Sequence, residues 1–301
     1  MLSLFLLIVE PKIRLLGFNN LSIRGFEILF DGLSATKISS LDLSFSLGPF
    51  PWNVLAAKIL KLKHLKSLNL SGVVLRQENL KHLCDILSLS NIENISLMGS
   101  FNAVPSSVLK RELPAVFKCM KKIKSLNLSY NKLNPEILWS LTKSMKELTN
   151  LRVLKLSNTN ILDADYFTRR KLLSVGFVFR FIESVKNVEV LDVSGNNLGY
   201  EGAKLMLKEL KERNKKIREN VVRIENELIF CREINDSELR IAREKRFRKE
   251  LRELKELEKR FKVLAFYNCN VAFKAPGGII DELNSDDFLQ NVLKTLLKPF
   301  V

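Results

Sequence analysis

The sequence predicts an α/β solenoid with a curved parallel sheet inside, helices outside, and a helical hairpin at its C-terminal end. Three observations lead to this fold class. A short apolar alternation followed by a helical stripe recurs seven times along the chain. The interval of roughly 27–29 residues suits one small strand–helix unit rather than a domain. After residue 203 the pattern changes to a charged segment without glycine or proline, in which apolar residues follow a heptad spacing.

The clearest unit is VEVLDVSGNNLGYEGAKLM, at Val188–Met206. Leu191 and Val193 alternate with polar residues, as in a strand that buries one face. Asn196 follows at the point where the chain turns inward, and the residues around Met206 continue as one apolar stripe of a helix. Such a unit cannot bury its apolar face alone, so it predicts neighbours stacked on it.

Six earlier copies supply those neighbours. At the position of Leu191 they carry Leu16, Leu41, Leu68, Ile95, Leu126 and Leu154. The successive steps are 25, 27, 27, 31, 28 and 37 residues. A period of this size with a helical return resembles the ribonuclease-inhibitor type of leucine-rich repeat, over roughly residues 13–210. The resemblance implies a horseshoe with a parallel sheet along its inner surface.

The chain departs from that resemblance in two ways. Only Asn131 and Asn196 occupy the inward-turning asparagine position, so we expect no continuous asparagine ladder through the core. Two steps are long because they contain Phe101–Pro114 and Asp163–Phe181. Such insertions map to loops or longer helices on one face, often a binding face, or they record drift in a tolerant loop.

The charged segment predicts a helical hairpin or coiled coil over residues 203–264. Asn235–Ser237 separates two apolar seams with residues that favour turns and helix N-caps. We expect two antiparallel helices of about 30 residues each. The hairpin either caps the solenoid or projects to pair with itself or another protein, and the basic stretch Arg240–Lys249 allows contact with anionic lipid. The seams are Ile217, Val221, Ile224, Leu228 and Cys231, then Phe247, Leu251, Leu254, Leu257, Phe261 and Leu264.

Three parts follow from these patterns. Residues 1–202 form the horseshoe with an N-terminal cap, in which Leu2–Val9 covers the open end of the first repeat; a short uncleaved targeting segment is the alternative. Residues 203–264 form the hairpin. Residues 265–301 form a connector and a terminal amphipathic helix that starts near Ser285 and stops at Pro299. No stretch is long and apolar enough to predict a transmembrane helix.

Charge and cysteine content limit the environment and the partners. The net charge of +16 favours acidic partners, nucleic acid or anionic membrane. The lysines are spread over the chain without interleaved aromatic residues, which disfavours nucleic acid as the ligand. The cysteines, which form no CxxC pair, predict buried thiols in a cytoplasmic compartment rather than disulfides or a zinc site. They are Cys84, Cys119, Cys231 and Cys269.

The sequence contains no catalytic constellation. His64 and His82 each lie beside lysines in a predicted repeat helix, which indicates solvated positions. Asp42 and Asp192 face the inner surface but stand about five strands apart, too far to act as an acid–base pair. No phosphate-binding loop, nucleophile elbow or metal-ligand motif occurs. We therefore expect a protein that is not an enzyme and that holds no cofactor and no metal.

Partner binding is expected on the concave face. In each strand the residue between two buried apolar positions points to this face. Small polar residues predominate there, and aromatic residues or arginines, which dominate binding hot spots, are few. The favoured centre is Tyr130 with Lys155 and the Phe101–Pro114 insertion. The full set of candidate partner-binding residues is Tyr130, Lys155, Asn127, Met98, Phe45, Asn69 and Asp192.

These features predict a non-enzymatic protein-interaction scaffold. The strings LNLSYNKL and LDVSGNNLG are similar to repeats of secreted effectors of intracellular bacteria and of intracellular immune receptors. No nucleotide-binding motif precedes the repeats, so the similarity to effectors is favoured, with action in a host cytosol. Two alternatives stay open: a structural protein that self-assembles through the hairpin, and a basic binder of RNA or anionic lipid.

Overall fold

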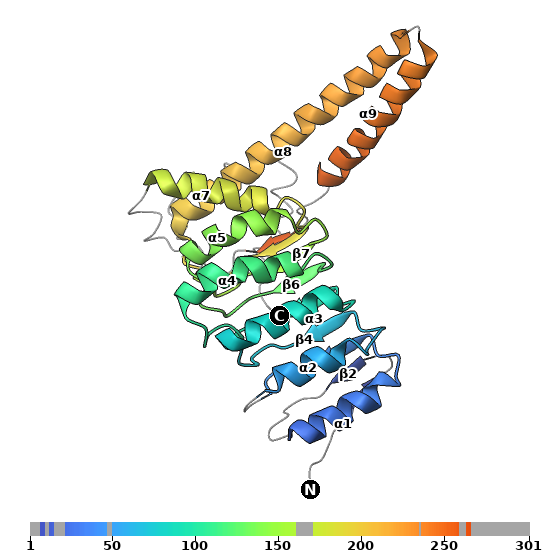
Figure 1. Cartoon of the computed structure of the whole chain (residues 1–301). Helices are drawn as coiled ribbons and strands as arrows, with labels where there is room; N and C mark the ends of the chain where they lie inside the picture. Colours follow the sequence, from blue (N-terminus) through green and yellow to red (C-terminus); the bar gives the residue numbers. More distant parts are fainter. Residues whose placement is uncertain are drawn as a thin grey trace.

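The computed structural model describes residues 7–9, 12–14, 22–46, 50–160, 171–234, 236–258 and 263–265. Over these residues the chain forms a stacked α/β solenoid with a helical hairpin projecting from its C-terminal end (Figure 1). One sheet runs through the stack with its nine strands in sequence order. The predicted fold class is confirmed.

Each strand is three residues long, and the strands follow one another across the sheet in the order of the sequence. They are β1 (Leu7–Val9), β2 (Lys12–Arg14), β3 (Ser40–Asp42), β4 (Ser67–Asn69), β5 (Asn94–Ser96), β6 (Ser125–Asn127), β7 (Val153–Lys155), β8 (Val190–Asp192) and β9 (Val263–Ala265). All neighbouring pairs are parallel except β1 with β2. The outer layer consists of α1 (Ile23–Ser34), α2 (Trp52–Ile59), α3 (Leu80–Leu89), α4 (Ser106–Cys119), α5 (Pro135–Lys146), α7 (Lys171–Ser184) and the first part of α8 (Gly199–Phe230).

The register confirms the predicted repeat positions from the second copy onward. Leu41, Leu68, Ile95, Leu126, Leu154 and Leu191 lie opposite one another in successive strands, and all are buried. With the buried faces of the outer helices they form one continuous apolar core that extends from Phe26 to Leu210. Each unit is stabilised by its neighbours, as expected for a solenoid.

The first repeat position was wrong. Ile13, rather than Leu16, lies opposite Leu41, and Leu16 is outside the described residues. The register is set by the antiparallel pairing of Leu7–Val9 with β2, in which Ile8 faces Ile13. A tight antiparallel pair fixes which residues face each other, and the apolar alternation alone does not.

The broken asparagine ladder is partly completed by hydroxyl groups. Ser46, Ser100 and Thr159 stand at the asparagine position and are buried. The Oγ of Ser100 donates to the carbonyl of Leu70 at 2.8 Å, in the preceding repeat. Short hydroxyl side chains therefore pair buried backbone carbonyls where the sequence lacks asparagine.

The insertion at Phe101–Pro114 forms part of the core rather than a protruding loop. Phe101 and Val104 are buried, and the rest of the segment lengthens α4. Residues 161–170 of the second insertion lie outside the described residues, and its remainder belongs to α7. The first long step is thus a longer outer helix, one of the outcomes expected for an insertion in a solenoid.

The hairpin consists of α8, with 32 residues, and α9 (Ser237–Glu258), with 22 residues. A single-turn helix at Cys231–Glu233 follows α8. Asp236 then caps α9, because its Oδ1 accepts hydrogen bonds from the backbone N–H groups of Glu238 and Leu239 at 2.9 and 3.0 Å. Helix α8 runs without a break across the predicted boundary between residues 202 and 203, and that division stays a prediction.

The predicted second seam extends too far. Leu264 was expected in the second helix of the hairpin, but it lies in β9 opposite Leu191. Helix α9 ends at Glu258, eight residues short of the expected length. The edge of β8 explains why Leu264 joins the sheet. Without β9, the backbone N–H and C=O groups along that edge would have no partner strand. The connector after Ala265, the terminal helix near Ser285 and the segment before Leu7 lie outside the described residues.

Candidate functional site

The polar side chains at the ends of the inner strands are engaged locally. The Oδ1 atoms of Asn69, Asn127 and Asp192 each accept a hydrogen bond of 3.0 Å from the backbone N–H two residues further along. Asp42 makes the same contact. This geometry is an Asx-turn, which ends the strand and starts the inward bend. Three predicted partner-binding residues therefore also have a structural role, while all remain half-exposed.

The serines that follow this row are mostly buried and contribute to packing. Ser129 is buried, and its Oγ accepts a hydrogen bond from the backbone N–H of Ser157 at 3.1 Å in the next repeat. Ser71 and Ser96 place their Oγ atoms 2.7 Å apart. These contacts link adjacent repeats at the strand ends. The serine row is therefore part of the framework that supports the concave face.

One residue further along, every repeat from β3 to β8 adopts a left-handed backbone conformation. These residues are Phe45, Gly72, Gly99, Tyr130, Asn158 and Gly195, with φ between 53° and 71°. Glycine and asparagine tolerate this conformation, whereas a bulky side chain is strained in it. Phe45 and Tyr130 are thus exceptions in an otherwise regular row. They are also exposed, at 56% and 57%.

Phe45 lies over the glycine of the next repeat. A Cβ atom added at Gly72 would come within 2.5 Å of Phe45 Cδ1. The ring therefore occupies the space that a side chain at position 72 would take. Gly72 is needed both for its positive φ and for this close contact.

Tyr130 is held by two asparagine side chains. Asn131 is fully buried, and its Nδ2 donates to the carbonyls of Leu97 and Leu128 at 2.9 and 2.8 Å. Asn102 donates to the Tyr130 carbonyl at 2.9 Å and accepts from the Lys132 N–H at 2.9 Å. The backbone of Tyr130 is thus fixed on both sides while its ring faces solvent. Strain of this kind persists only where the surrounding structure enforces it.

Lys155 lies in β7 between Asn127 in β6 and Asp192 in β8. Its side chain is exposed. The structure therefore places Asn127, Lys155 and Asp192 on three adjacent strands, with Tyr130 just beyond the end of β6. Phe45 and Asn69 belong to a second group: Phe45 follows β3, three strands or about 14 Å from β6, and Asn69 lies in β4, two strands or about 10 Å from β6. Half-buried Met98 lies between the groups, in the repeat of β5.

Sequence reasoning missed two residues of this surface. Asn102 follows the strand by several residues and gives no periodic signal, so its contact with Tyr130 depends on the stacking of two repeats. Asn158 is exposed in the repeat next to Tyr130, and its side chain covers Gly195. The glycine at the equivalent position of three other repeats was a signal that could have identified it, because asparagine, like glycine, tolerates a left-handed conformation.

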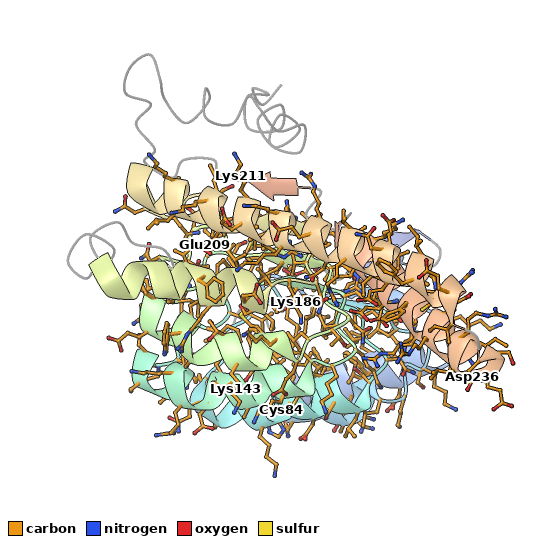
Figure 2. The ribbon with its side chains drawn as sticks, turned by 90° about the horizontal axis from the view of Figure 1, so that it is seen from above. Cys84, Lys143, Lys186, Glu209, Lys211 and Asp236 are labelled. Carbon is orange, nitrogen blue, oxygen red and sulfur yellow. The ribbon has the colours of Figure 1, made fainter. Side chains whose placement is uncertain are left out.

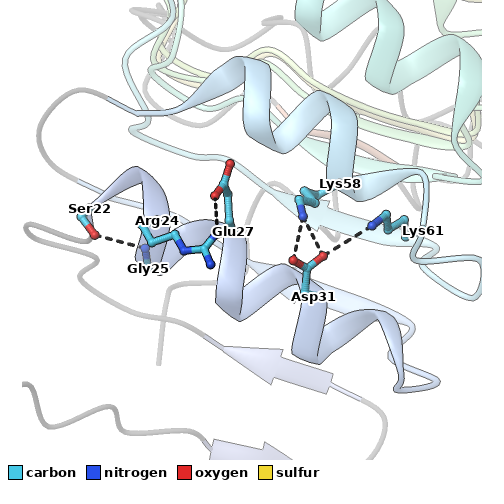
Figure 3. Close-up of polar contacts among 7 residues, drawn as sticks. All are labelled: Ser22, Arg24, Gly25, Glu27, Asp31, Lys58 and Lys61. Carbon is cyan, nitrogen blue, oxygen red and sulfur yellow. Dashed lines mark hydrogen bonds and ion pairs between the residues drawn. The ribbon is translucent and has the colours of Figure 1, made fainter.

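A second surface gathers lysines that are scattered in the sequence. Basic residues in the last helical turns and the following loops lie along one edge of the solenoid, which we call the basic rim. Asp31 in α1 accepts from the Nζ atoms of Lys58 and Lys61 at 2.7 and 3.5 Å (Figure 3). The Lys58 hydrogen bond, more than the charges, holds the pKa of Asp31 below its ordinary value. The rim comprises Lys37, Lys58, Lys61, Lys63, Lys66, Lys118, Lys121, Lys122, Lys124, Lys143, Lys146 and Arg152.

Glu93 forms the most central ion pairs of the basic rim. Its carboxylate lies 2.8 Å from the Nζ of Lys66 and 2.6 Å from the Nζ of Lys124. Hydrogen bonds from Lys124 and Lys66 lower the pKa of Glu93 to about 2. Basic residues exceed acidic ones along this edge, and Leu60 and Leu89 are exposed among them. In the sequence these basic residues form no single run, and the stacking of repeats gathers them along one edge.

Among the described residues, no group of three or more histidine, cysteine or acidic side chains is arranged to hold a metal ion. In the same residues, no helix is long and apolar enough to cross a membrane. His64 and His82 lie on outer segments, remote from the concave face. The inner face presents the exposed ring of Tyr130 in the repeat next to the exposed side chain of Lys155.

Two stretches of the chain, residues 119–141 and 186–207, match the family described as Leucine Rich repeat. They include the buried residues Asn131 and Asn196. Over 218 residues the chain is 29% identical to the human protein "NACHT, LRR and PYD domains-containing protein 13", a match that covers 70% of this chain and 20% of that relative. The chain thus spans about one fifth of the length of this curated relative.

Among solved structures, the chain is similar to one titled "Structural Genomics of Caenorhabditis elegans: tropomodulin C-terminal domain". The identity is 13% and the TM-score 0.32, with 64% of this chain and 96% of that chain covered.

Proposed function

We propose that this chain is a protein-binding scaffold whose contact surface is the concave face around Tyr130 and Lys155. Its leucine-rich repeats are of a kind that generally binds proteins rather than catalysing reactions. The observation that carries the proposal is the conformation of Tyr130. An exposed tyrosine in a left-handed conformation, fixed by Asn102 and Asn131, gives the fold no evident benefit. A partner that takes up its ring provides a reason for the strain.

The chemistry of the surface indicates the kind of partner. Tyr130 offers a rigid aromatic ring with a hydroxyl group, a residue type enriched at binding hot spots. Lys155 and Asp192, adjacent in β7 and β8, offer opposite charges. Because the backbone is already ordered by stacking, little conformational entropy is lost when a partner binds. A folded protein or peptide with an apolar pocket beside an acidic group matches this pattern.

Quantitative interaction proteomics with two double variants tests the proposal. The concave variant is Tyr130→Ala/Lys155→Glu. The matched convex variant is Ile28→Ala/Lys208→Glu, which changes one exposed apolar residue and one exposed lysine on the outer helices. We expect a saturable partner that binds wild type and the convex variant equally and loses at least tenfold in affinity for the concave variant. Equal affinity for the concave variant and wild type would discard this site.

The finer proposal is that the chain acts as an effector delivered into the cytosol of a host cell. Its support is the similarity of LNLSYNKL and LDVSGNNLG to repeats of secreted effectors. A translocation assay tests it, with the chain fused to a reporter enzyme whose substrate is confined to the host cytosol. Reporter signal that depends on the secretion system of the source cell supports delivery. Signal equal to that of a secretion-defective strain contradicts it.

The basic rim supports a second candidate function, contact with an anionic lipid surface. Its lysines surround exposed Leu60 and Leu89, and lysine beside exposed leucine is the combination that anionic bilayers attract and partly bury. Each lysine near such a surface contributes about 1 kcal/mol. Self-assembly through the heptad seams has less support, because Ile217, Val221 and Ile224 are already buried within the single chain.

Sedimentation with vesicles tests the rim. We expect binding to vesicles that contain phosphatidylserine and none to neutral vesicles, with loss of binding in Lys63→Glu/Lys121→Glu. Arg76→Glu/Lys132→Glu, which changes the same charges on the opposite edge, should bind as wild type does. Binding that persists in the rim variant, or that a duplex RNA supports in place of the vesicles, would overturn the lipid proposal.

A further inference from the structure

Two cysteines that are distant in the sequence meet on the outer face of the solenoid. Cys84 lies in α3 and Cys119 at the end of α4, and their Sγ atoms are 2.9 Å apart. Both side chains are half-buried. Figure 2 shows Cys84 on the layer of outer helices, well away from the tip of the hairpin at Asp236. The sequence predicted buried thiols, whereas these two are half-buried and the stacking of α3 against α4 brings them together as a pair.

We propose that Cys84 and Cys119 form a dithiol site at which a small-molecule disulfide of the glutathione class is reduced while the two thiols close to an intrachain disulfide. A disulfide bond is about 2.05 Å long, so the sulfur atoms need to approach by less than 1 Å. Side-chain rotation within two neighbouring helices can supply this movement. The proposal concerns the convex face and does not depend on partner binding at Tyr130.

A groove beside the pair leaves room for the oxidant. It has a volume of about 340 Å³ and is bordered by Cys84 together with Lys81 and Glu112 from the two helices. A space of this size is within the range that holds small molecules. Lys81, Glu78 and Glu112 line it with one ammonium and two carboxylate groups, which can pair with the carboxylate and ammonium groups of a ligand such as glutathione disulfide. Cys84 borders the groove, and the Sγ of Cys119 lies 2.9 Å from the Sγ of Cys84.

The two cysteines have different parts in the reaction. Burial, followed by the hydrogen bond and charge of Cys119, raises the pKa of Cys84 to about 12. The raised pKa makes Cys84 the less reactive of the two, so we assign the first attack to Cys119 and the closing step to Cys84. The Cys119 thiolate attacks one sulfur of the oxidant, which forms a mixed disulfide at Cys119 and releases one glutathione thiolate.

The second step closes the protein disulfide. Cys84 loses its proton as its Sγ attacks the Sγ of Cys119, which breaks the mixed disulfide and releases the second glutathione. The two thiols of the protein are oxidised, the oxidant is reduced to two thiols, and the two protons of the cysteines end on the released glutathione molecules. The new bond closes a span of 35 residues between the outer helices that flank β5.

Intact-mass analysis and peptide mapping test the proposal on the full chain in a Cys231→Ser/Cys269→Ser background. Buried Cys231 serves as the unpaired control in wild type. With glutathione disulfide at mildly alkaline pH, we expect the loss of two hydrogens, a linked pair of peptides containing Cys84 and Cys119, and no retained glutathione. The oxidised chain should unfold roughly 5–10 °C higher, and dithiothreitol should reverse the shift.

Single variants separate the steps. Cys84→Ser should retain one glutathione on Cys119, because the closing thiol is absent. Cys119→Ser should retain far less on Cys84, and neither variant should show the thermal shift. Two outcomes would overturn the proposal. One is the retention of two glutathiones on the pair. The other is that both thiols can still be titrated after a treatment that converts a small dithiol compound, used as a control, to its disulfide. If the Cys231→Ser/Cys269→Ser chain fails to fold, peptide mapping of the wild-type chain shows in the same way whether Cys84 and Cys119 are linked.

Discussion

The solenoid and the hairpin are built on different principles. In the solenoid, leucines such as Leu126 and Leu154 are fully buried between two neighbouring repeats, and buried asparagines pair the backbone at the corners. In the hairpin, Arg213 of α8 still donates to the Lys186 carbonyl of the solenoid at 2.7 Å. Further along, α8 packs on α9 through a narrow seam and two ion pairs between the helices, Arg223–Glu250 and Lys255–Glu225. Exposed ion pairs contribute little. The comparison shows that α8 is held in the solenoid by its first turns. The tip of the hairpin, in contrast, depends on the contacts between α8 and α9.

The largest expected effect comes from removing one apolar side chain in each region. Leu126→Ala should lower the free energy of unfolding by about 3–5 kcal/mol, because it leaves a cavity inside the stacked repeats. Ile224→Ala should mainly increase local opening of α8 and α9 and leave the strands protected. Native-state hydrogen exchange measures both. Equal loss of protection in the sheet and the hairpin would mean that the two regions unfold as one unit.

A second pair of variants compares two asparagines four residues apart. Asn131→Ala removes the side-chain hydrogen bonds to the carbonyls of Leu97 and Leu128 and from the N–H of Phe101, all in a buried corner, so we expect a loss of roughly 2–4 kcal/mol. Asn127→Ala removes only an Asx-turn contact at the half-exposed end of β6, with a loss below about 1 kcal/mol. Urea unfolding gives the two values, and similar losses would contradict the assigned roles.

Replacement of Tyr130 should change the free energy of unfolding by less than the asparagine variants do, and in the stabilising direction. Tyr130→Gly removes an exposed side chain from a left-handed position, so the free energy of unfolding should stay constant or rise by up to about 1 kcal/mol. Gly72→Ala, at the equivalent position, should be destabilising because its Cβ would collide with Phe45. Thermal unfolding of both variants checks the contrast. Clear destabilisation by Tyr130→Gly would show that the tyrosine serves the fold.

The smallest effect concerns pH and the basic rim. Lys124 and Lys66 lower the pKa of Glu93 from 4.5 to about 2 in the folded chain. The ionised form is therefore favoured by folding. Its contribution to stability is complete above pH 4.5 and is lost as the pH falls toward 2. Wild type should lose more thermal stability than Glu93→Gln between these values, and parallel pH profiles would exclude the ion pairs as the cause.

Much of the candidate surface followed from periodicity. The row that contains Phe45 and Tyr130 was located by counting from the strand leucines, and their exposure is as expected for the concave face. Counting did not show that Asn69, Asn127 and Asp192 bond to their own backbone, because an Asx-turn depends on the local bend. Nor did it show the contact of Asn102 with Tyr130, which exists only between stacked repeats.

By itself, the sequence determined the repeat, its buried positions from Leu41 to Leu191, and the change to a helical hairpin, since the spacing of apolar residues decides which faces leave water. Tertiary structure decided which residues of different repeats meet. It placed Leu264 in the sheet beside Leu191, gathered the lysines along one edge, and brought Cys84 to Cys119. These outcomes depend on the pairing of strand edges and on the distance between stacked helices, and no pattern within one repeat carries that information.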